Sequence, residues 1–237
     1  MPALQIYFSD YFGITPEAVE NAGAFNVSLI NDLPLFIDPF LLFNSNEPEY
    51  RALHDQIIQY LRFLRDKSVE GGISEALLKN WYVFSEVRQT WLGFSRTGNK
   101  GSGLRMEFAH ALNDSLNSIF SDFGAEKVAH GSHLEKVCLI KDKVGRDKIS
   151  DFTTNLIKEY LLNFTQAIAR DLLEPRQRRV FRVERVRFNY VTESWERGDF
   201  ELPMFESDFV ILTPQRAVGG HIFASRFYVR HRPDQSH

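Results

Sequence analysis

The sequence predicts an α+β fold in which a mainly helical N-terminal three quarters packs on a small sheet formed by C-terminal strands. Before Pro175, apolar residues recur at three- and four-residue intervals in three long segments, which indicates amphipathic helices. After Pro175 the chain is rich in β-branched and aromatic residues separated by arginines, which is typical of strands. We expect one domain over residues 1–214 and an irregular or disordered tail over residues 215–237.

In the first third of the chain, we expect three helices and one extended segment. A short helix follows Thr15, because threonine caps free helix amides. Residues 35–43 are expected to form a buried extended segment broken by a turn, since a proline biases the residue before it away from helical geometry. A long amphipathic helix covers residues 48–67, and Ser74 caps a shorter helix after it.

The rest of the chain is expected to contain two long helices and two strands. One helix covers residues 104–120, and the other starts at residues 147–151 and continues to residue 173, where Pro175 stops it. The strands are expected at residues 180–191 and 209–212.

Composition and charge exclude several classes of protein. Among 237 residues, 28 Lys and Arg oppose 31 Asp and Glu, so the net charge of -3 gives no global field that selects nucleic acid or an anionic membrane. A single cysteine, Cys138, excludes an intramolecular disulfide. The first residues do not form a secretory signal, and no apolar run reaches the roughly 18 residues of a membrane helix. We therefore expect a cytoplasmic protein with no membrane partner.

An acidic group at the start of the last long helix is a candidate magnesium site. Asp147 and Asp151 are four residues apart, and Asn155 follows one helical turn later, so the three share a helix face. Magnesium prefers oxygen ligands and keeps waters for a phosphate substrate. Asp147 and Asp151 are the candidate catalytic residues, and all three are candidate metal ligands. The alternative is that Asp147 or Ser150 simply caps the helix.

A cluster of arginines is the strongest local charge bias. Guanidinium groups match phosphate oxygens and stay charged, so these residues are candidate phosphate or nucleic-acid contacts. The alternative is that they pair with local acids such as Glu174, Glu184, Glu193 and Glu196. The cluster consists of Arg176, Arg178, Arg179, Arg182, Arg185 and Arg187.

The glycine-rich stretch 93–103 carries Lys100, a further candidate for anion binding. It is not a P-loop, because Asn99 separates Gly98 from Lys100 and Gly101 follows the lysine. The stretch does lead into a helix N-terminus, whose free amides favour anions. A solvated loop is the alternative.

These features favour a protein that handles nucleic acid or a phosphate ligand. In one version it is a metal-dependent phosphodiesterase or nuclease. Known nuclease signatures are absent, however: no acid and lysine stand two apart after Asp151, and the chain has no Asp-x-Asp. The alternative is a non-catalytic interaction or oligomerising subunit, because 21 phenylalanines exceed what one modest core needs and could form an apolar association patch. Both an enzyme and a non-enzyme stay open.

Residues 145–157 and 209–214 resemble segments of uncharacterised bacterial proteins found near mobile elements and defence genes. The resemblance covers about a tenth of the chain and brings no established activity. It implies a bacterial protein of a defence or mobile-element system.

Overall fold

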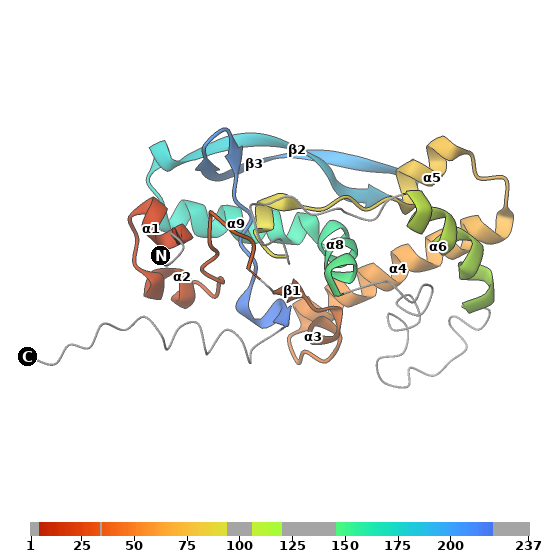
Figure 1. The fold of residues 1–237 in the computed structure, drawn as a ribbon, viewed down its shortest axis with the longest axis horizontal. Helices are drawn as coiled ribbons and strands as arrows, with labels where there is room; N and C mark the ends of the chain where they lie inside the picture. The colour runs from red at the N-terminus through yellow and green to blue at the C-terminus, as the bar shows by residue number, and fades with distance from the viewer. Residues whose placement is uncertain (1–4, 34, 94–105, 120–145, 220–237) are drawn as a thin grey trace, which may run out of the picture.

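The structure, a computed structural model of the chain, describes residues 5–33, 35–93, 106–119 and 146–219 (Figure 1). Within these ranges the helices are α1 (Phe8–Phe12), α2 (Pro16–Asn21), α3 (Pro39–Phe43), α4 (Pro48–Glu70), α5 (Glu75–Tyr82), α6 (Met106–Ile119), α8 (Arg146–Leu156) and α9 (Lys158–Leu172). The strands are β1 (Phe36–Ile37), β2 (Arg178–Asn189), β3 (Ser194–Phe205), β4 (Asp208–Phe209) and β5 (Val218–Gly219). Short 3₁₀ helices are η1 (Arg88–Thr90), η2 (Pro175–Gln177) and η3 (Gln215–Ala217).

The predicted α+β class is confirmed. The strands β2, β3 and β4 form an antiparallel sheet in that order, near the C-terminal end of a mainly helical chain. Figure 1 shows the β2–β3 hairpin as a long ribbon above α9 and α8, and α4 packs against α8 below. The sheet therefore lies over the helices.

Two predicted helix starts are confirmed by their caps. The Thr15 hydroxyl accepts a hydrogen bond from the Ala18 amide at 3.2 Å, and the Ser74 hydroxyl accepts one from the Leu77 amide at 3.3 Å. The long helix expected at residues 48–67 is α4, and its predicted apolar stripe is buried. Local chemistry was enough to predict these elements.

The segment 35–43 was predicted to be extended and broken by a turn, and this is wrong in its second half. Residues Phe36–Ile37 form β1, but Pro39–Phe43 form the short helix α3. Proline is compatible with the first position of a helix, where its missing N–H has no partner to lose. Pro39 therefore starts a helix here instead of only breaking the chain.

The single helix predicted over residues 147–173 is also wrong, because it divides at Ile157. That residue has φ -101° and ψ 16°, and α8 and α9 run in different directions on its two sides (Figure 1). The change of direction alters which side chains face the core. Tyr160 and Phe164 are only partly buried. The buried residues of α9 are Lys158, Leu161, Leu162, Thr165, Ile168 and Ala169.

The sequence analysis predicted a strand where β2 lies but did not predict β3, so it did not predict the β2–β3 hairpin. Its register is interrupted after the pair Val183–Gly198 and resumes at Arg187–Glu196, so residues 184–186 of β2 oppose only Arg197 of β3. This bulge bends β2 and re-aims its side chains. It places Arg185 in a left-handed backbone conformation with φ 53°.

The strand predicted at residues 209–212 is mostly wrong. Only Asp208–Phe209 pair as β4; the Val210 amide still donates to the Pro203 carbonyl of β3 at 3.1 Å, but the amides after it donate to partners outside the sheet. The Ile211 amide donates to the Gln89 carbonyl at 2.8 Å, and the Leu212 amide donates to the Thr165 hydroxyl at 2.9 Å. This segment thus ties helices and loops together.

Residues 215–219, which the sequence analysis assigned to the tail, form η3 and β5, and β5 pairs with β1. The remainder of that predicted tail lies outside the described residues.

The aromatic residues of the described part pack mainly inside. The larger of two buried clusters joins α4, α5, α8, α9, β2 and β3, and the smaller joins α1, α2, the end of α9 and residues 210–212. Tyr60 is the centre of an aromatic group in the larger cluster, with ring contacts to Phe63, Phe84, Phe188 and Trp195.

Candidate functional site: a buried lysine at a pocket beneath the β2–β3 hairpin

The predicted acidic group is only partly within the described structure. The side chain of Asp147 and the whole of Lys100 lie outside it. Asp151 is half-buried and already engaged by other groups. The buried Asn155 amide donates to the Ser85 carbonyl at 2.6 Å and to the Asp151 carbonyl at 2.8 Å. Among the described residues, no three or more His, Cys, Asp or Glu side chains gather as a metal site.

Most of the predicted arginines have acidic or aromatic partners on the β2–β3 hairpin or next to it. Arg187 contacts Glu196 at 2.6 Å and Glu159 at 3.4 Å, and its pKa is raised chiefly by the hydrogen bond that it donates to Glu196. The other contacts are Arg176–Glu174 at 2.7 Å, Arg178–Glu201 at 3.3 Å, Arg182–Asp199 at 3.7 Å, and Arg179 over the Phe181 ring at 4.6 Å. Local pairing thus accounts for much of this charge.

Arg185 differs from the other arginines because the bulge turns it inward. Its guanidinium donates to the Val83 carbonyl at 3.0 Å and lies 4.7 Å from the centre of the Trp195 ring. Burial lowers the pKa of Arg185. No described carboxylate forms an ion pair with it.

Lys158, which the sequence analysis did not select, is a buried cation. It is the first residue of α9, immediately after the break at Ile157, and only 8% of it is exposed. Burial lowers the pKa of Lys158 to about 8, and the charge of Arg185 lowers it further. Its ammonium makes no hydrogen bond or ion pair within the described part of the chain. A buried charge without a partner is unusual, because the loss of hydration costs several kcal/mol.

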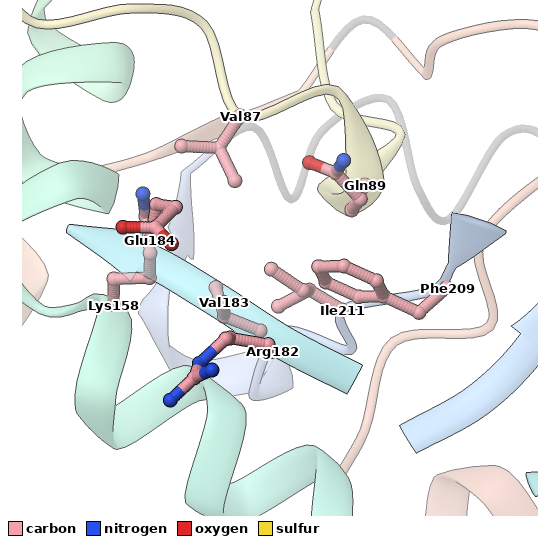
Figure 2. A pocket seen from close by; sticks show the side chains of 8 residues that line it. All are labelled: Val87, Gln89, Lys158, Arg182, Val183, Glu184, Phe209 and Ile211. Atoms are coloured by element: carbon pink, nitrogen blue, oxygen red, sulfur yellow. The ribbon is translucent and has the colours of Figure 1, made fainter. Parts of the chain in front are cut away.

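Lys158 lines a pocket of about 220 Å³ beneath the hairpin (Figure 2). Three elements besides α9 form its walls: η1 with its flanking residue, the bulged part of β2, and β4 with the residues after it. Four of the lining side chains are apolar and four are polar. The lining consists of Val87, Gln89, Lys158, Arg182, Val183, Glu184, Phe209 and Ile211.

Hydrogen bonds from neighbouring elements fix these walls. The side-chain amide of Asn155 donates a hydrogen bond to the carbonyl of Ser85, which stands two residues before the lining residue Val87. The Gln89 side chain donates to the Asp208 carboxylate at 2.9 Å, and the Gln89 carbonyl accepts from the Ile211 amide at 2.8 Å. The predicted metal ligand Asn155 therefore acts as a structural support of the pocket wall.

Of the predicted site residues, the structure brings two close to this pocket. Arg182 lines it, although Arg182 also contacts Asp199, and Arg185 acts electrostatically on Lys158. The missed signal was a lysine in phase with apolar residues: Lys158, Leu161, Leu162 and Thr165 follow three- and four-residue spacing on one face of α9.

Over residues 13–222 the chain matches a family model described as a domain of unknown function, DUF8370. The chain belongs to the DUF8370 family. The matched range includes every residue that lines the pocket, so the pocket lies inside the DUF8370 domain. The expectation of an uncharacterised family is confirmed. No curated protein and no solved structure matches the chain. None of the helices in the described ranges has both the length and the apolar character needed to cross a bilayer.

Proposed function

We propose that the protein binds a small phosphorylated ligand in the pocket beneath the hairpin, with the phosphate at Lys158. The observation that carries this proposal is the buried ammonium of Lys158, which borders an open pocket without a described anionic partner. The nearby charge of Arg185 increases the cost of keeping Lys158 protonated. A bound phosphate supplies the missing negative charge and forms charge-assisted hydrogen bonds.

The pocket walls indicate what the rest of the ligand resembles. The Phe209 ring and the side chains of Val87, Val183 and Ile211 offer an apolar surface to a ring or short hydrocarbon group. About 220 Å³ is below the roughly 300–1,000 Å³ of drug-sized sites, which favours a small molecule. Glu184 is exposed and is the one carboxylate in the lining, so a ligand with a second negative charge near it is disfavoured.

The same observations favour a small ligand over a nucleic acid. A nucleic-acid backbone that binds the exposed arginines must displace Glu196 from Arg187 and Glu174 from Arg176. Lys158 is too deeply buried to contact a continuous backbone. A small phosphorylated compound needs neither displacement.

Calorimetric titration with phenyl phosphate, inorganic phosphate and phenol tests this function. We expect phenyl phosphate to bind more tightly than inorganic phosphate, and phenol not to bind. Lys158→Met removes the buried charge and should weaken phenyl phosphate binding at least about tenfold, because a buried charge contact contributes more than about 1.4 kcal/mol. Arg187→Met, which removes a paired cation from the same hairpin, is the matched control and should bind normally.

Two results would contradict the proposal. In one, the wild-type protein does not bind phenyl phosphate. In the other, a single-stranded oligonucleotide binds with steep salt dependence and phenyl phosphate does not compete, which would place the phosphate contacts on the outer arginines.

The metal-dependent phosphodiesterase version stays a prediction, because it depends on Asp147, whose side chain lies outside the described residues. Magnesium-dependent cleavage of DNA or RNA that is lost in Asp151→Ala would support it.

The oligomerising alternative also stays a prediction. Its motivation was a surplus of aromatic residues, but in the described ranges the exposed large apolar side chains lie on separate elements and include no phenylalanine. They are Tyr11, Val69, Leu77, Val180 and Val191. A strict monomer in light scattering at high concentration would argue against it.

The bacterial origin, the association with defence or mobile-element genes and the cytoplasmic location are further proposals, which rest on the sequence resemblance and the single cysteine. A survey of gene neighbours tests the association, and cell fractionation tests the location.

A further inference from the structure

We propose that Lys158 is a nucleophile that forms an imine with a carbonyl group of the ligand, so that the site takes a phosphorylated aldehyde or ketone. This inference rests on the proposed function, because the pocket must first admit the ligand; once the carbonyl reacts with Lys158, the phosphate is held by Arg182, the other cation of the lining. It goes further by assigning a covalent step to one atom, the Lys158 Nζ.

Geometry provides the first argument. An amine can attack a carbonyl only when its nitrogen borders a space that the carbonyl can enter, and Lys158 lines the pocket in Figure 2. The nitrogen must also be free, and within the described residues no carboxylate or carbonyl engages it. Lys67, in contrast, is held by Glu70 at 3.1 Å and Glu193 at 2.9 Å.

The electrostatic surroundings provide the second argument. Lysine nucleophiles are activated by an apolar pocket or by a neighbouring cation, because both favour the neutral amine. Lys158 has both, since Val87, Val183 and Ile211 line the pocket and the charge of Arg185 acts on it. The other charged groups of the pocket, Arg182 and Glu184, come from β2 and are both exposed. Gln89 on η1 is uncharged.

The bulge in β2 provides the third argument. Arg185 is kept at φ 53°, a conformation that a non-glycine residue seldom adopts, and its guanidinium is held by the Val83 carbonyl and the Trp195 ring. Strained backbone of this kind persists where surrounding contacts enforce it, and it concentrates at functional sites. Here it brings a second cation near Lys158.

The reaction is a condensation and needs no oxidant or reductant. The Nζ lone pair forms a bond to the carbonyl carbon, and the nitrogen loses a proton while the oxygen gains one, giving a carbinolamine. Loss of the hydroxyl group as water, with the second nitrogen proton, leaves a carbon–nitrogen double bond. One amine and one carbonyl compound thus give one imine and one water. The protons exchange with solvent at the open mouth of the pocket.

Reductive trapping tests the inference on the full chain. The protein is incubated with pyridoxal 5′-phosphate, an aromatic aldehyde that carries a phosphate, and is then reduced with borohydride. Intact-mass measurement and peptide mapping locate the adduct. At neutral pH we expect labelling at Lys158 at least about tenfold above that of any exposed lysine, because a lower pKa gives a larger neutral fraction. Its rate should rise with pH to a plateau above about 8.

Two matched variants separate the role of Lys158 as a nucleophile from the effect of its positive charge. Lys158→Arg keeps the positive charge but has no nucleophilic amine, so it should lose the adduct, and a cooperative urea unfolding transition shows that it is folded. Lys79→Arg changes an exposed lysine on α5 and should label as the wild type does.

The outcomes are distinguishable. If the wild type binds phenyl phosphate but is labelled equally on all exposed lysines, the imine inference is wrong and the proposed function stands. If the wild type binds no phenyl phosphate, the proposed function fails, and the imine inference fails with it. An adduct on Lys158 that pyridoxal without phosphate forms equally well would contradict the phosphorylated class of the substrate.

Discussion

Two sets of cations on and beneath the same hairpin have opposite surroundings. Along the hairpin, Arg187 is paired with Glu196 and Glu159, and Arg182 contacts Asp199. Beneath it, Lys158 and Arg185 lie near each other and form no ion pair with a carboxylate of the described residues. Exposed pairs cost little to maintain, whereas an unpaired buried charge costs several kcal/mol. This difference is the basis of our proposal that Lys158 and Arg185 serve a ligand, whereas the paired arginines interact within the fold.

The largest effect is expected on the free energy of unfolding, when the buried charge of Lys158 is removed. Lys158→Met replaces the buried ammonium with an apolar chain of similar length. We expect the free energy of unfolding at pH 7 to rise by about 3 kcal/mol, because a pKa lowered from 10.5 to about 8 corresponds to that cost of the charged form. Urea unfolding measures it. A clear loss of stability would show that the Lys158 ammonium is stabilising where it lies.

The pH dependence sharpens the same prediction. The pKa of Lys158 is lower in the folded state than in the unfolded state, so between about 8 and 10.5 the unfolded chain binds more protons. The wild type should therefore gain stability as pH rises through this window. The advantage of Lys158→Met is full below pH 8 and disappears above pH 10.5. A difference that is constant with pH would assign the effect to packing instead of charge.

A smaller effect is expected from the acid at the pocket. Glu184→Gln removes the carboxylate of the lining while keeping the shape of the side chain. Phenyl phosphate should then bind about two- to fivefold more tightly, since one exposed repulsion is worth less than about 1 kcal/mol. Calorimetric titration measures it, with Glu206→Gln in an exposed turn as the control. Weaker binding in Glu184→Gln would mean that the carboxylate contacts the ligand favourably.

The smallest effect on stability and binding is expected when a paired arginine of the hairpin is removed. Arg187→Met removes a cation that is more than half exposed and paired with two acids. The free energy of unfolding should fall by no more than about 1 kcal/mol, as for other exposed ion pairs. Equal phenyl phosphate binding by this variant and the wild type would support the contrast between the two sets. A large loss of binding would remove it.

Local chemistry let the sequence predict several elements. Thr15 and Ser74 cap the helices that they were expected to cap, and the spacing of Leu53, Ile57 and Leu64 predicts the buried face of α4. These features depend on residues within a few positions of one another, so a single sequence contains them.

The site was harder to predict because it depends on distant parts of the chain. The break at Ile157 changes the direction of the helix, so Lys158 takes a buried position that an unbroken helix would not give it. Arg187 finds Glu196 only through the register of β3, which was not predicted. The arginines were correctly seen as a charge bias, but their partners are set by tertiary structure.

The most direct test measures the ionisation of Lys158 itself, by NMR of lysine labelled with ¹³C at Cε, in the free protein and with phenyl phosphate. The account predicts a titration midpoint near 8 in the free protein, and a higher midpoint once phosphate neutralises the site. A free-protein midpoint equal to that of the exposed lysines, or a midpoint that phenyl phosphate leaves unchanged, would contradict it.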